Sequence, residues 1–181
     1  NRCRRQRQMC IRDSIKGAKI WTLEGEGIIE KGDVLIDKGK IIEVGEEISV
    51  NGNDTRIVDG SGMHLTPGII DEHSHIALSG VNEGSQSNTA EVRMKDVINS
   101  EDVNIYRQLA GGVTTSQLLH GSANAIGGQS AIVKFRWGSS PEEMIISDAD
   151  EYIKFALGEN VKRSRATSVS YTHLTLPTTP V

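Results

Sequence analysis

The segment that most restricts this chain is an apolar run that ends in alternating acidic and imidazole side chains, Pro67-Gly-Ile-Ile-Asp-Glu-His-Ser-His75. Residues two apart on a β-strand face the same side. Asp71, His73 and His75 are therefore predicted to share one face at the end of a strand. Neutral imidazoles about 7 Å apart along a strand can converge on one divalent cation, and zinc suits them. Asp71 is placed as a ligand or as the acceptor of a ring N–H.

A His-x-His triplet alone is a weak signal. The chain has 5 histidines among 181 residues, and a shuffled chain of this composition would contain such a triplet in about one case in seven. The metal hypothesis therefore depends on the whole string, in which the triplet follows an apolar run and a Pro-Gly pair. Coincidence is the alternative interpretation.

Charge and cysteine content exclude some classes of protein. The formal net charge is −4, and an acidic chain is a poor binder of phosphate backbones, so no nucleic-acid partner is expected. No stretch approaches the roughly 18 apolar residues of a membrane span, so no membrane partner is expected. Both cysteines, Cys3 and Cys10, precede residue 15, which excludes disulfides and thiolate metal sites from the rest of the chain. Localisation stays open between cytoplasmic and exported.

The chain divides into four predicted segments. Residues 1–14 are basic without the apolar core of a secretory signal, and residues 167–181 are rich in threonine. Both resemble translated adapter DNA, so we expect them to be non-native; a basic arm and a flexible linker are the alternative. Residues 15–62 have short strands around glycine turns, which predicts a small antiparallel sheet. Residues 63–166 alternate strands with helices, which predicts a parallel α/β arrangement.

Turn signals and apolar periodicity predict the individual elements. In the first part we expect strands over 15–23, 34–36, 40–44 and 57–59, with turns at 32–33 and 37–39. In the second part we expect strands over 67–75, 113–119, 131–137 and 152–157, and helices over 103–110 and from 141 to 146. Asn99-Ser-Glu-Asp102 has the form of a capping box before the first helix, with Asn99 as the cap.

A β-rich segment followed by Pro-Gly-x-x-Asp-x-His-x-His, a helix and Gly112-Val-Thr-Thr115 resembles the amidohydrolase superfamily. Within it, the chain is similar to the imidazolonepropionase-like, metal-dependent members over residues 15–165. The resemblance implies an α/β fold: a (β/α)8 TIM-type barrel preceded by a small β-sandwich segment, with the metal at the C-terminal mouth of the strands and 67–75 as the first of them. Such a barrel takes about 250 residues, so we expect an incomplete barrel, an N-terminal fragment with exposed apolar faces.

The resemblance also implies further metal ligands and a catalytic base. Glu159, after the last predicted strand, is the best candidate for a bridging carboxylate, and Lys154 as a carboxylated lysine is the alternative. A third interpretation is that neither residue is a ligand. His120 ends a predicted strand and is a candidate catalytic residue that faces substrate or supports a ligand; a packed loop histidine or a ligand remain alternatives. His64 is expected to be structural.

These residues predict a hydrolase of amide or cyclic amide carbon–nitrogen bonds, not peptide bonds. His73 and His75 would hold a divalent metal, zinc by preference, and Asp71 would orient them while a bound water attacks a small-molecule amide substrate. We expect the full-length protein to be compatible with a homo-oligomer, and residues 1–181 to be inactive alone. A non-catalytic β-rich metal-binding module and a deacetylase or dipeptidase branch of the superfamily are the alternatives. Substrate, metal identity and metal number stay open.

Overall fold

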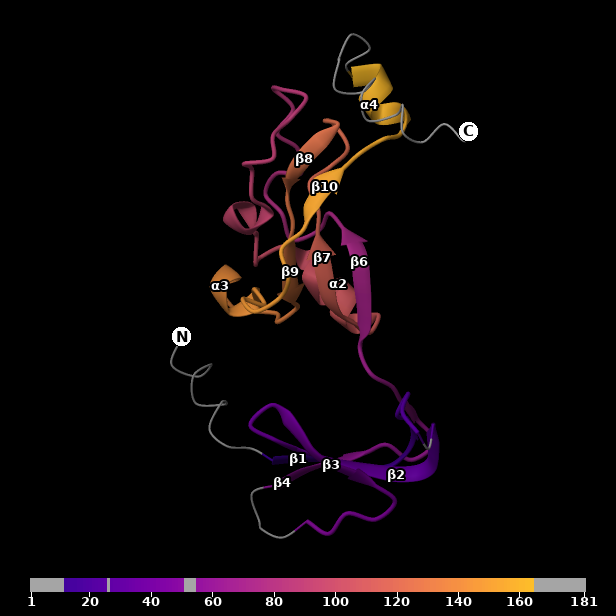
Figure 1. The fold of residues 1–181 in the computed structure, drawn as a ribbon. Coiled ribbons are helices and arrows are strands. Elements are labelled where there is room, and N and C mark those ends of the chain that lie inside the picture. The colour runs from indigo at the N-terminus through magenta and orange to yellow at the C-terminus, as the bar shows by residue number, and fades with distance from the viewer. Residues whose placement is uncertain (1–11, 26, 51–54, 165–181) are drawn as a thin grey trace, which may run out of the picture. The chain divides into compact units, whose positions relative to one another are not determined.

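The computed structural model describes residues 12–25, 27–50 and 55–164, and the chain separates into two compact units, Asn1–Pro67 and Gly68–Val181 (Figure 1). The C-terminal tail predicted over 167–181 and both cysteines lie outside the described residues. Arg12–Ser14, which the sequence assigns to the N-terminal tail, form the start of the first strand.

The first unit holds one five-stranded mixed sheet with the order β3-β2-β1-β4, and β5 also pairs with β1. The strands are β1 (Arg12–Trp21), β2 (Ile28–Asp37), β3 (Lys40–Gly45), β4 (Thr55–Asp59) and β5 (His64–Leu65). β1, β2 and β3 pair antiparallel, whereas β4 and β5 run parallel to β1. The prediction of an antiparallel sheet is therefore wrong for β4 and β5, because each reaches β1 through a return connection rather than through a hairpin.

The turn predicted at 37–39 is confirmed, and the turn predicted at 32–33 is wrong. Lys38 and Gly39 form the connection between β2 and β3 with φ of 51° and 75°, the left-handed region that glycine adopts without strain. Gly32 and Asp33 lie inside β2 instead. Asp33 is not a turn residue because its carboxylate is buried among hydrogen-bond donors.

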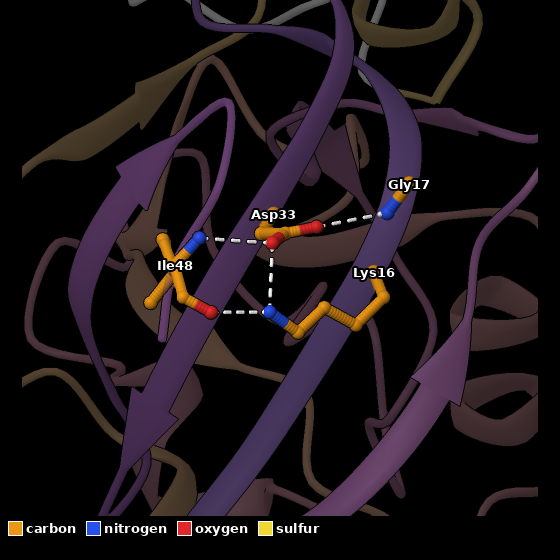
Figure 2. A network of polar contacts seen from close by, with 4 residues as sticks. All are labelled: Lys16, Gly17, Asp33 and Ile48. Atoms are coloured by element: carbon orange, nitrogen blue, oxygen red, sulfur yellow. Dashed lines mark hydrogen bonds and ion pairs between the residues drawn. The ribbon is translucent and has the colours of Figure 1, made fainter. Parts of the chain in front are cut away.

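The Asp33 carboxylate, on a residue only 7% exposed, ties together three segments of the first unit. Its Oδ2 accepts from Lys16 Nζ at 2.7 Å and from the Ile48 N–H at 3.0 Å, and its Oδ1 accepts from the Gly17 N–H at 3.0 Å (Figure 2). Lys16 Nζ also donates to the Ile48 carbonyl. The network joins β1 and β2 to the segment after β3, beside the buried apolar side chains of Ala18, Ile20 and Val34.

The second unit contains two small sheets and short helices. One sheet has the order β6-β7-β9 and the other pairs β10 with β8. The strands are β6 (Ile69–Ser74), β7 (Val113–Leu118), β8 (Ile126–Gln129), β9 (Ala131–Lys134) and β10 (Ile153–Phe155); the α-helices are α2 (Val103–Ala110), α3 (Pro141–Met144) and α4 (Glu159–Ser164), and Met94–Val97 form a 3-10 helix. Among the described residues no helix has the length and apolar character needed to cross a bilayer.

The pairing in the second unit is mixed, which corrects the prediction of a parallel arrangement. β6 and β7 pair in parallel, but β9 runs antiparallel to β7, and β10 runs antiparallel to β8. β8 and α4 were not predicted. The glycine-rich sequence around Gly127 and Gly128 predicts a loop. It forms a strand through pairing with β10 and with the segment 88–93.

The helix predicted over 103–110 is confirmed as α2, but its N-cap is Asp102 rather than Asn99. Asp102 Oδ1 accepts the Asn104 N–H at 2.9 Å, and Oδ2 accepts the Ala77 N–H at 2.8 Å. One carboxylate therefore caps α2 and fastens it to the segment that follows β6. Asn99 Oδ1 instead accepts the Glu101 N–H at 3.1 Å, in the turn that precedes α2.

The two strings of sequence that carry the superfamily resemblance pack against each other. A Cβ placed on Gly68 would lie 2.1 Å from Thr114 Oγ1, so the Pro-Gly pair requires glycine for a close approach. The Ile69 N–H donates to the Gly112 carbonyl at 2.9 Å. These contacts set β6 beside β7 and so place the end of β6, where the histidines lie.

Candidate metal centre

The end of β6 brings two imidazole rings together. His73 lies in β6 and His75 just follows it. The two Nε2 atoms are 3.2 Å apart, and the rings meet edge to face with centroids 5.1 Å apart. The predicted convergence of these two rings is therefore seen in the structure, whereas their role as metal ligands stays a prediction.

The carbonyl of Leu119 orients the His75 ring. His75 Nδ1 lies 2.9 Å from this oxygen, and because a carbonyl only accepts, Nδ1 carries the proton. The lone pair is then on Nε2, the atom that faces His73. A backbone carbonyl that fixes the tautomer in this way is typical of metal-binding histidines.

Asp71 acts on the backbone rather than on a ring. Its Oδ1 accepts the His73 N–H at 3.1 Å. The pairing of β6 with β7 is irregular between Asp71 and Ser74, so the simple alternation assumed from the sequence is interrupted there. The predicted role of Asp71 as a ligand or as the acceptor of a ring N–H stays a prediction, and the His75 ring has Leu119 as its acceptor, a contact between segments far apart in the chain.

Lys154 of β10 reaches the histidine pair. Its Nζ lies 3.5 Å from His73 Nε2. Desolvation lowers the pKa of His73, the positive charge of Lys154 and the neighbouring His75 lower it further, and Asp71 opposes them. His73 is therefore held in its neutral form, the form that can donate a lone pair to a metal.

The donor set fits part of a metal site. Two Nε2 atoms face one another, as ligands of a zinc-like cation would. Across residues 12–25, 27–50 and 55–164, no three His, Cys, Asp or Glu side chains gather in a way that could hold a metal. Lys154 Nζ is a further nitrogen close to this pair.

The other predicted site residues have the following surroundings. His120 is fully buried, with Nε2 accepting the Glu83 N–H at 2.8 Å and Nδ1 donating to the Gly121 carbonyl at 2.9 Å; its catalytic role stays a prediction. Glu159 begins α4, and its ligand role also stays a prediction. His64 accepts the Trp21 Nε1–H at 2.9 Å and stacks on that ring, as a structural histidine would.

Two similarities to known proteins decide the family. The chain is 36% identical over 152 residues to Amidohydrolase tasK from Hapsidospora irregularis, a match that covers 73% of this chain and 16% of that protein. It also matches the crystal structure of an amidohydrolase from Thermotoga maritima MSB8 with a TM-score of 0.75 and 39% identity, over 85% of this chain and 41% of that one. The chain belongs to the amidohydrolase superfamily.

An imidazolonepropionase from Idiomarina loihiensis is 38% identical over 69 residues, which are 38% of this chain and 17% of that protein. No protein-family model matches the chain. The chain spans less than half the length of each of these three relatives. Amidohydrolases of this superfamily generally use a divalent metal.

Proposed function

We propose that this chain supplies the first metal ligands of a zinc-dependent amidohydrolase that opens an amide or cyclic amide bond in a small molecule. The facing Nε2 atoms of His73 and His75 carry the proposal. They lie at the C-terminal end of a strand that pairs in parallel with β7, the place where a TIM-type barrel holds its active site. β6 would be the first strand of that barrel.

Each residue near the pair has a separate task in this proposal. A bound divalent cation would lower the pKa of a water toward neutrality and polarise the substrate carbonyl. Leu119 keeps the His75 lone pair on Nε2, and Asp71 holds the His73 backbone. Together these contacts aim both imidazoles at one point, which reduces the ordering cost of binding a metal.

We place Lys154 ahead of Glu159 as the third ligand, because its Nζ lies 3.5 Å from His73 Nε2. A lysine ammonium cannot ligate a cation. If the neutral amine attacks carbon dioxide, an N–C bond forms and a proton leaves, and the resulting carbamate offers an anionic oxygen. The pair then gains a carboxylate-type ligand beside the two imidazoles.

The experiment is a zinc titration of the whole chain with matched histidine variants. We expect His73→Ala and His75→Ala each to weaken zinc binding by at least about 100-fold, more than the loss of an outer-shell partner costs. His64→Ala is the control, because that histidine is engaged with Trp21. Equal zinc affinity in all four proteins would refute the proposal.

The third ligand is tested by comparing Lys154→Met with Glu159→Gln. We expect Lys154→Met to weaken zinc binding and Glu159→Gln to leave it unchanged. In the wild type, ¹³C-bicarbonate with zinc should produce a carbamate carbon signal that Lys154→Met abolishes. The opposite ranking of the two variants would assign the ligand to Glu159.

A further inference from the structure

The His120 ring is closely enclosed, and both of its nitrogens are hydrogen-bonded. The residue is fully buried. Its Nδ1 faces the Gly121 carbonyl and so carries the proton, while its Nε2 faces the Glu83 N–H and so carries the lone pair. One neutral tautomer satisfies both contacts, so the imidazole bridges two segments with no ring nitrogen left for a substrate.

Two glycines of β8 make room for this ring. A Cβ on Gly127 would lie 2.9 Å from His120 Nδ1, and a Cβ on Gly128 would lie 3.2 Å from His120 Cδ2. Any side chain at Gly127 would press on the imidazole. The glycine-rich sequence here predicts a flexible loop, but these two glycines are needed because the backbone packs closely against His120.

The segment 81–89, which follows β6, is fastened by the same region. Gly121 N–H donates to the Val81 carbonyl at 2.7 Å. The buried Asn124 amide donates to the Glu83 carbonyl at 2.6 Å and to the Gln86 carbonyl at 2.8 Å. Glu83 is thus held on both sides, its N–H by His120 and its carbonyl by Asn124.

Leu119, the residue before His120, orients the ring of His75, one of the two proposed metal ligands. Leu119 donates its N–H to the Ser74 carbonyl at 3.0 Å and accepts from His75 Nδ1 at 2.9 Å. One short segment, 119–121, therefore contacts the His75 ring at one end and the segment 81–89 at the other. A movement of either end changes the position of the Leu119 carbonyl.

We propose that His120 is a positioning residue: by fastening segment 81–89 to segment 119–121, it fixes the Leu119 carbonyl and so the His75 ring. This inference rests on the proposed metal site. Metal binding at His75 and order in segment 81–89 are then coupled, and coupling of this kind is reciprocal. His120 acts through Leu119 and does not touch the metal.

The test compares two substitutions that each keep half of the His120 chemistry. Gln at position 120 can keep an acceptor for the Glu83 N–H, whereas Asn keeps only a donor toward Gly121. We expect His120→Asn to weaken Zn²⁺ binding about 10-fold, the lower end for outer-shell residues, and His120→Gln to retain most of the affinity. Hydrogen exchange of segment 81–89 should become at least about 10-fold faster in His120→Asn, because a buried hydrogen bond is lost.

Two further variants separate coupling from general destabilisation. Gly127→Ala leaves every hydrogen-bonding group in place but displaces the ring, and it should reproduce the effects of His120→Asn. Val133→Ala shortens a fully buried side chain of the apolar core and removes no hydrogen-bonding group, so it should leave zinc affinity unchanged. If His120→Asn fails to fold, the comparison of Gly127→Ala with Val133→Ala decides.

The outcomes distinguish the two hypotheses. Faster exchange together with weaker zinc binding in His120→Asn and Gly127→Ala supports the inference. If wild type binds zinc through His73 and His75 but neither variant changes the affinity, the inference is overturned while the proposed metal site stands. If wild type binds no zinc, the proposed metal site fails, and the coupling fails with it.

Discussion

Removing the Asp33 carboxylate tests how far one buried charge holds the first unit together. In Asp33→Ala, three donors lose their acceptor: Lys16 Nζ and the N–H groups of Gly17 and Ile48 (Figure 2). Breaking a buried ion pair costs about 3–5 kcal/mol. Because the Lys16 side chain is 30% exposed and still donates to the Ile48 carbonyl, we expect the lower end, about 3 kcal/mol.

The assay is urea unfolding followed by tryptophan fluorescence. Trp21 lies in β1 of the first unit and Trp137 lies in the second unit. In a Trp137→Phe background the tryptophan fluorescence therefore reports only on the unfolding of the first unit. Asp13→Ala is the control, because the Asp13 carboxylate pairs with the exposed Arg56 side chain and such pairs contribute about 0.2–1 kcal/mol. A loss in Asp33→Ala no larger than the loss in Asp13→Ala would refute the reasoning.

The same network makes the stability of the first unit depend on acid. Burial raises the pKa of Asp33, but hydrogen bonds from the Ile48 N–H, Lys16 and the Gly17 N–H outweigh it and hold the pKa below its usual value. A lowered folded-state pKa contributes stability that is complete above the unfolded value of about 3.9 and is lost as pH falls through the folded value. The difference between wild type and Asp33→Ala should therefore be constant near neutral pH and shrink below about pH 4.

Two further substitutions test the packing that places the metal pair, and both are measured by urea unfolding through Trp137, whose ring contacts Tyr106 of α2. Gly68→Ala should lose about 1–3 kcal/mol by overpacking against Thr114, and Thr114→Ala should recover part of that loss; additive effects of the two would contradict the contact. Asp102→Asn keeps one cap oxygen but no longer accepts from Ala77, so it should cost about 1–2 kcal/mol. Asp102→Ala should cost more, because it also removes the cap; equal losses would show that only the contact with Ala77 matters.

Local patterns in the sequence predicted some elements well. Apolar spacing and a Gly-Gly stop predicted α2, and the Asp-Lys-Gly string predicted the turn between β2 and β3. They failed where a side chain serves a distant partner. The sequence around Asp33 predicts a turn, because nothing local shows that its carboxylate is buried against Lys16 and Ile48. The glycines of β8 predict a loop, because nothing local shows that they make room for His120.

The candidate site divides in the same way. The string ending in His73 and His75 by itself determined which imidazoles could meet, because two residues of one strand end need only local geometry to converge. The tertiary structure alone decided that Leu119 orients His75 and that Lys154 reaches His73. Those contacts join residues dozens of positions apart, and the pairing of separate strands, which no short stretch of sequence encodes, is what brings them within hydrogen-bonding distance.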